Sequence, residues 1–201
     1  MSKVKIRFFA GFIESQTKWL NSMSAKGYRL VKTGKMRYVF EECEAGKYAY
    51  AVEYVGDKSF KEEENYKEFL EDMGYTVFYK NMNLDFSPFK ITFRPWAEKG
   101  GKISSNTKRS TYNKELLIVE KERDGKPFEL HTDNEDLANY YDRLSVPWVY
   151  GCFLFLLWGI LAWPFMPVVC VAGAGALLCG TFFGRARHKI KQILKNNELE
   201  E

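Results

Sequence analysis

The chain has 201 residues, of which 46% are hydrophobic and 28% charged, and this composition excludes an intrinsically disordered protein. The formal net charge of +4 at pH 7 is too small to indicate a nucleic-acid-binding protein by itself. The length fits one globular domain with an additional segment.

Residues 1–96 have the patterns of short strands and helices. Polar and apolar residues alternate over 3–9, which favours a strand, whereas apolar residues recur at helical spacing over 13–26, before Gly27. The same criteria predict a hairpin of strands 28–33 and 36–42, a strand over 47–54, a helix from Ser59 to about Met73, and strands near 75–80 and 88–94. The order βαβββαββ predicts an α+β domain: a ferredoxin-like antiparallel sheet with helices on one face.

The next segment is harder to assign. Residues 97–111 are polar and basic, which is typical of a linker or loop that can contact anionic head groups. Residues 112–124 fit either a helix that ends at Gly125 or a hairpin that turns at Asp124–Gly125, and we favour the helix. Thr132 and Glu135 form a second capping box, so we predict a helical juxtamembrane segment over 112–145.

The 38 residues from Val146 to Phe183 include no Asp, Glu, Lys, Arg or His. One helix of this length would measure roughly 57 Å, whereas the hydrocarbon core of a bilayer is about 30 Å thick. Pro164 and Pro167 mark a break between two spans, over 146–163 and 166–183. We therefore predict a transmembrane helical hairpin over 146–183.

The flanks of the hairpin predict its orientation. Arg143 precedes the first span, and a basic then acidic tail over 184–201 follows the second, with no charge between the spans. Since positive flanks stay in the cytoplasm, we expect both termini to be cytoplasmic. The small residues Ala172, Ala176, Gly180 and Gly184 recur every four positions. This stripe favours close helix packing, either within the hairpin or in a homodimer.

Motifs of catalysis and cofactor binding are absent from the sequence: there is no GxGxxG, P-loop, HExxH or GxSxG. The four cysteines form no CxxC pair and no cluster with histidine. We expect no cofactor, no metal and no catalytic residue, and hence not an enzyme. Gly46–Glu53 resembles an RNA-recognition strand only in its paired aromatics, so we expect no nucleic-acid partner.

Aromatic residues are concentrated on the predicted strands. They pack a core, or they line a ligand cleft together with a few polar groups. The residues of this speculative cleft are Trp19, Arg37, Tyr38, Phe40, Tyr48, Tyr50 and Glu53. An enzyme that uses Arg37, Glu53 and nearby tyrosines is a further alternative.

Three groups of segments resemble a known bacterial family. They are Lys18–Asn21 with Ala25–Tyr28, Tyr38–Glu41 with Gly46–Tyr50, and Arg123–Leu130 with Thr132–Glu135. Together they resemble the family called domain of unknown function 2812, over about residues 5–145. The resemblance implies a fold, a bacterial membrane protein in many members, and a gene neighbour that encodes a PadR-type regulator. It implies no activity.

These observations predict a membrane-anchored cytoplasmic sensor or adaptor in the bacterial cell membrane. Its α+β domain would bind a small apolar ligand, a lipid or a partner protein, and membrane lipids would surround the hairpin. The alternative is an accessory subunit of a membrane protein complex, with the small-residue stripe as its contact, or a homodimer.

Overall fold

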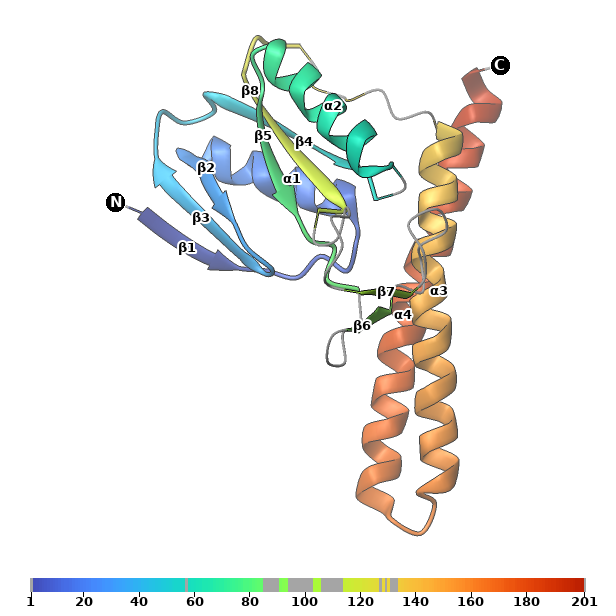
Figure 1. Ribbon diagram of the computed structural model, residues 1–201. Helices are drawn as coiled ribbons and strands as arrows, with labels where there is room; N and C mark the ends of the chain where they lie inside the picture. The colour runs from blue at the N-terminus through green and yellow to red at the C-terminus, as the bar shows by residue number, and fades with distance from the viewer. Residues whose placement is uncertain are drawn as a thin grey trace. The chain divides into compact units, whose positions relative to one another are not determined.

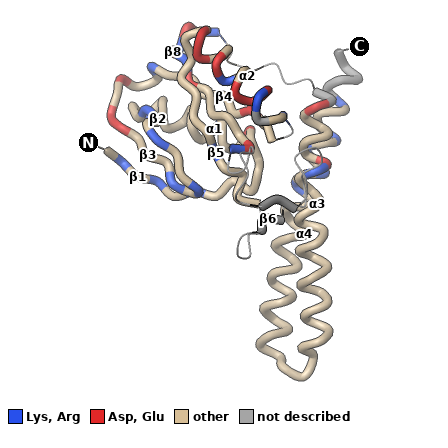
Figure 2. The backbone as a smooth tube through the Cα atoms, in the orientation of Figure 1, with Lys and Arg blue, Asp and Glu red and all other residues tan. Residues whose placement is uncertain are grey.

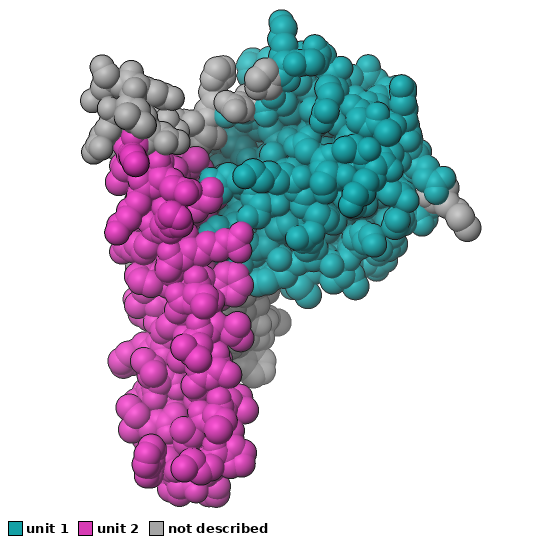
Figure 3. Space-filling view, turned by 180° about the vertical axis from the view of Figure 1, so that it is seen from behind, with its two compact units in different colours: residues 1–131 teal, residues 132–201 magenta. Residues whose placement is uncertain are grey.

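The computed structural model describes residues 2–56, 58–84, 91–93, 103–105, 114–126, 128, 130 and 134–200. The chain divides into two compact units, Met1–His131 and Thr132–Glu201, which Figure 3 shows in different colours. The first unit contains all the strands together with two helices, and the second contains two long helices (Figure 1). The predicted α+β class with antiparallel strands, followed by a long apolar helix pair, is confirmed.

The first part of the N-terminal unit follows the sequence prediction closely. It consists of β1 (Ser2–Ile6), α1 (Ile13–Ala25), β2 (Tyr28–Thr33) and β3 (Arg37–Glu42). The strands form an antiparallel sheet in the order β1-β3-β2. Gly27 ends α1 with φ +80°, and a Cβ at this position would lie 3.0 Å from the backbone oxygen of Cys43. The turn from α1 to β2 therefore requires glycine.

A second antiparallel sheet completes the N-terminal unit. It has the order β4-β8-β5, formed by β4 (Tyr48–Tyr54), β5 (Thr76–Lys80) and β8 (Leu116–Glu122). Helix α2 (Phe60–Asp72) connects β4 to β5, and the predicted capping box of Ser59 and Glu62 is confirmed. The short strands β6 (Ile91–Phe93) and β7 (Ile103–Ser105) pair with each other.

The helix expected within residues 112–124 is wrong, because Leu116–Glu122 is the central strand β8. Strand β8 pairs with β4 on one side and with β5 on the other. Residues 116–120 are all buried, and a strand buried on both faces has a continuous apolar run that resembles a buried helix. Residues 97–111, expected as a loop, contain β7. The rest of that loop lies outside the described residues, as does Thr132 of the second capping box.

A buried polar contact joins the two sheets. Glu120 on β8 is 2% exposed, and it accepts hydrogen bonds from Arg29 Nε of β2 at 2.9 Å and from the Tyr50 hydroxyl of β4 at 2.6 Å. The backbone N–H of Leu30 on β2 donates to the same hydroxyl at 2.8 Å. Burial, followed by the hydrogen bond to Glu120, raises the pKa of Tyr50, so the phenol remains a neutral donor. The position of β2 is thus fixed against β4 and β8.

The C-terminal unit is a helical hairpin. Helices α3 (Asn134–Leu161) and α4 (Met166–Glu200) are separated by a turn at the predicted break around Pro164. The described part of the chain has two helices long and apolar enough to cross a membrane. In Figure 2 the halves of α3 and α4 that adjoin this turn carry neither the colour of acidic residues nor that of basic residues. The juxtamembrane helix expected to begin at 132 is continuous with the first apolar segment.

The helices of the hairpin contact each other through small residues. A Cβ at Gly175 would lie 2.6 Å from the Phe155 ring, and one at Gly151 would lie 2.9 Å from Cys179 Sγ. Of the predicted stripe, Ala172 is buried, Ala176 and Gly180 are half-buried, and Gly184 is exposed. Because four residues turn a helix by about 400°, a stripe of this spacing rotates by roughly 40° per step and leaves the contact face.

Replacement of Tyr50 by phenylalanine tests the contact between the sheets. Tyr50→Phe should lower the free energy of unfolding of the N-terminal unit by about 1–3 kcal/mol, because Glu120 and the Leu30 N–H each lose a buried partner. The measurement is urea denaturation of the full chain in detergent, followed by near-UV circular dichroism. Tyr28→Phe is the matched control, since the Tyr28 hydroxyl accepts only a partly exposed hydrogen bond from Lys3. Equal losses in the two variants would contradict the role of Tyr50.

Candidate functional site

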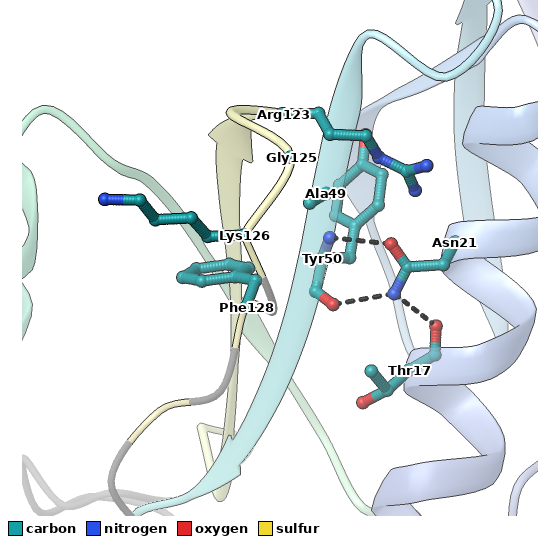
Figure 4. A pocket seen from close by; sticks show the side chains of 8 residues that line it. All are labelled: Thr17, Asn21, Ala49, Tyr50, Arg123, Gly125, Lys126 and Phe128. Carbon is teal, nitrogen blue, oxygen red and sulfur yellow. Dashed lines mark hydrogen bonds between the residues drawn. The ribbon is translucent and has the colours of Figure 1, made fainter.

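A groove of about 430 Å³ lies between α1 and β4 in the N-terminal unit. Its walls come from three segments: α1, the first part of β4, and the turn that follows β8 (Figure 4). The lining residues are Thr17, Asn21, Ala49, Tyr50, Arg123, Gly125, Lys126 and Phe128. Its volume is within the range of small-molecule sites.

The floor of the groove is fixed by a side chain that caps a strand edge. The Asn21 amide nitrogen donates to the Tyr50 carbonyl oxygen at 2.8 Å, and the Tyr50 N–H donates to Asn21 Oδ1 at 3.0 Å. Ser24 Oγ donates to the neighbouring Tyr48 carbonyl oxygen at 2.5 Å. These bonds replace those of a missing adjacent strand, so α1 is held against β4 and the groove has a rigid base.

The turn after β8 forms the opposite wall. The Arg123 N–H donates to the Lys47 carbonyl oxygen at 2.8 Å, and Gly125 has φ +80°, a conformation that glycine adopts without strain. Asp124 accepts hydrogen bonds from the Lys121 ammonium group and the Lys126 N–H, each at 3.1 Å. The wall is therefore an ordered turn.

The groove is electropositive. Arg123 and Lys126 line it, and none of the lining residues that the structure describes is acidic. Figure 4 shows the Arg123 guanidinium on the side of β4 where Asn21 lies, and the Lys126 side chain extending away from both. The Phe128 ring, with Tyr75 at 5.5 Å and the Lys121 ammonium group at 4.8 Å, adds an aromatic edge. This arrangement suits a small polar ligand better than an apolar one.

The structure distributes the seven residues of the speculative cleft over several places. Trp19, Tyr38 and Phe40 pack against each other, with the Trp19 centroid 4.9 Å from that of Tyr38 and 5.6 Å from that of Phe40. Tyr38 and Phe40 are fully buried in the core between α1 and the first sheet. Arg37 is exposed on the opposite face of β3, as strand alternation requires.

The remaining three residues lie on β4 and face different neighbours. The Tyr48 ring lies under the Arg29 guanidinium at 4.5 Å, and Tyr50 reaches Glu120. Glu53 accepts a hydrogen bond from the Tyr66 hydroxyl of α2 at 2.5 Å, and burial raises the pKa of Glu53. Of the seven residues, only Tyr50 lines the groove.

Another buried carboxylate belongs to α2 itself. Glu63 is fully buried, and neither of its carboxylate oxygens accepts a hydrogen bond within the described part of the chain. Burial, with a further contribution from the nearby Glu63 carboxylate, raises the pKa of Tyr79. None of these residues lines the groove, and the described residues contain no group of three potential metal ligands.

A family profile described as "Protein of unknown function (DUF2812)" matches residues 12–154. The chain belongs to this family. The matched DUF2812 region contains every residue of the groove and ends within α3, so α4 lies beyond it. No curated protein and no solved structure gives a significant match to the chain.

Most of the groove residues missed by sequence reasoning lie in segments that the sequence singles out. Asn21 belongs to the segment Lys18–Asn21, Ala49 to Gly46–Tyr50 together with the predicted Tyr50, and the turn residues to Arg123–Leu130, whereas Thr17 lies outside these segments. These segments carry the DUF2812 resemblance, and in the structure they meet around one groove. Only the three-dimensional pairing of β4 with β8 brings them together.

Lys80, at the end of β5, is a buried lysine apart from the groove. It is 3% exposed, and its ammonium group donates to the carbonyl oxygens of Gly34 and Lys35 in the turn between β2 and β3. Burial lowers the pKa of Lys80 to about 8, although the charge of nearby Glu115 opposes this shift. Burial therefore disfavours the charged form of Lys80, whereas the charge of Glu115 favours it.

The lowered pKa of Lys80 predicts a pH dependence of stability. The folded state releases the proton near pH 8 and the unfolded chain near 10.5, so the free energy of unfolding should rise with pH from about 8. The slope should be roughly 1 kcal/mol per pH unit. Above about pH 10 the rise should reverse, since the pKa values of Tyr38 and Tyr50 are raised and ionised tyrosine favours the unfolded state. Denaturation at pH 7.5, 8.5 and 9.5 measures the effect.

The control for this experiment separates Lys80 from other lysines. Lys80→Met should remove the rise between pH 8 and 10, whereas Lys32→Met, at an exposed position on β2, should retain it. A rise that persists in Lys80→Met would show that Lys80 is not its source.

Proposed function

We propose that the chain is a membrane-anchored cytoplasmic sensor or adaptor, in which the groove between α1 and β4 binds a small molecule or a segment of a partner protein. The observation that carries this proposal is the groove itself, which is lined by polar and basic side chains, in a chain that also contains an apolar helical hairpin. The hairpin supplies the anchor, and the groove supplies the recognition site.

The exposed surface of the hairpin supports the anchoring role. In each candidate span only 11% of the most apolar window is buried inside the chain. Large apolar side chains such as Leu154, Ile160 and Leu161 are more than half exposed. Water-exposed apolar surface of this extent is unfavourable, whereas lipid covers it without cost.

The charges at the end of α4 support a cytoplasmic N-terminal unit. Basic residues follow the apolar part of this helix: Arg185, Arg187, Lys189, Lys191 and Lys195. Arg187 also forms an ion pair of 2.8 Å with Asp142 of α3, on the segment that leads back to the N-terminal unit. Because basic flanks are retained in the cytoplasm, both termini are expected on that side.

Blocking the groove tests its role in binding. Thr17→Trp places a large ring in the groove, and the Thr17 hydroxyl bonds only within its own helix, to Ile13, so the fold should be retained. Native mass spectrometry of full-length wild-type protein should reveal a co-purifying small molecule or partner, and Thr17→Trp should lose it. Lys18→Trp, at an exposed site on the same helix, should keep it.

An empty wild-type protein that also captures no partner from solubilised membranes would contradict the proposal. A bound species that is equally abundant in Thr17→Trp would place recognition elsewhere. In cells, a phenotype that is insensitive to deletion of residues 146–184 would show that tethering is irrelevant.

The second candidate function is an accessory subunit of a membrane protein complex. It is favoured by two glycines of α4, Gly173 and Gly184, since a Cβ at either position would meet no atom within 4 Å. Small residues on an open helix surface let another transmembrane helix approach closely.

Bulky substitutions distinguish this outer surface from the inner surface of the hairpin. Gly173→Leu should break a complex on blue-native gels and leave the hairpin stable. Gly175→Leu should destabilise the hairpin itself, since its side chain would overlap Phe155. An assembly that is unchanged in Gly173→Leu would count against the accessory-subunit function.

A further inference from the structure

We propose that the ligand of the α1–β4 groove is a small organic anion whose carboxylate or phosphate group is bound by Arg123. The inference rests on the proposed ligand-binding function of the groove and specifies the chemical class of its ligand.

The charge balance of the groove is the first argument. Among the described residues, no acidic side chain pairs with the Arg123 guanidinium, and no lining residue is acidic. The adjacent carboxylate, Asp124, is bound to Lys121 and lies in the turn itself. A guanidinium presents five N–H donors that match a carboxylate or phosphate in geometry. Arg123 therefore offers an unused anion-binding group.

The positioning of Arg123 is the second argument. Its backbone N–H is bound to the Lys47 carbonyl oxygen, and the two bonds of Asp124 hold the following residues. The guanidinium consequently extends from a fixed turn over the edge of β4 (Figure 4). Because the backbone of the turn is already ordered, it does not have to be ordered on binding, which lowers the entropic cost.

The opposite wall indicates what else the ligand carries. Both N–H groups of the Asn21 amide are used, by the carbonyl oxygens of Thr17 and Tyr50. The Thr17 hydroxyl donates to the Ile13 carbonyl oxygen, so it has lone pairs left to accept a hydrogen bond. The α1 wall thus offers hydrogen-bond acceptors, whereas the Arg123 guanidinium offers hydrogen-bond donors. A hydroxyl or amine beside the anionic group fits this polarity.

The experiment uses the full chain in nanodiscs of phosphatidylcholine, a lipid without net charge. Binding of inorganic phosphate, lactate and glycerol 3-phosphate is measured by isothermal titration, with glycerol as the uncharged probe. At least one anion should bind, and glycerol should not. Arg123→Gln should weaken that binding by about tenfold or more, as expected for loss of a charged hydrogen-bonding group. Arg37→Gln, which removes an exposed arginine far from the groove on β3, should leave it unchanged.

The outcomes separate this inference from the function on which it rests. If none of the three anions binds, or if they bind equally to wild type and Arg123→Gln, the proposal that Arg123 binds an anionic ligand is overturned. If native mass spectrometry then shows an uncharged molecule that Thr17→Trp excludes, the groove remains a binding site of another class. If it shows nothing, and no partner is captured from solubilised membranes, the proposed function fails as well.

A last comparison identifies the source of the anion. The measurement is repeated in nanodiscs that contain phosphatidylglycerol, at matched ionic strength. If the natural ligand is a lipid headgroup, phosphatidylglycerol should compete with glycerol 3-phosphate and weaken its apparent affinity for the wild-type protein. Unchanged affinity would identify a soluble anion. Both results support an anionic ligand.

Discussion

The carboxylate of Glu120 is buried in the centre of the second sheet, where an unpaired charge would cost several kcal/mol. Its partners come from β2 and β4, so the charge is compensated only when both sheets are correctly placed. The Arg29 guanidinium is partly exposed and also covers the Tyr48 ring. A local charge requirement thereby becomes a constraint on the arrangement of the whole N-terminal unit.

Tyr50 extends this constraint to the groove. Its hydroxyl belongs to the Glu120 contact, whereas its backbone N–H and carbonyl group face the opposite way and are bound by Asn21 of α1. One residue therefore connects the buried core with the wall of the groove. Loss of the Tyr50–Glu120 contact would therefore also alter the base of the groove, because both depend on the position of Tyr50.

Most of the fold was predictable from local patterns, because capping residues, turn glycines and strand alternation act within a few positions of the chain. The hairpin of β2 and β3, the capping box at Ser59 and the break at Pro164 are examples. Strand β8 was not predictable in this way. Its partner β4 lies far away in the sequence, and an apolar run buried on both sides has no period to identify it.

The site was less predictable than the fold for a related reason. Aromatic residues on alternating positions fitted either a core or a cleft, because strand alternation alone does not reveal which face a helix covers. Trp19, in α1, covers Tyr38 and Phe40, whereas Arg37 points away from them. The groove depends instead on where a turn following β8 meets α1, which only the tertiary structure determines. The segments that resemble DUF2812 marked these residues without indicating their proximity.

The central position of β8 also has a consequence for biosynthesis. During translation, β4 and β5 emerge without the strand that lies between them, and the second sheet can close only after Glu122 has been made. The first apolar helix begins soon afterwards, at Asn134. Closure of the second sheet and synthesis of the apolar helices therefore follow each other closely. Until the sheet closes, the edges of β4 and β5 that β8 will cover are unpaired, and such edges favour association with other chains.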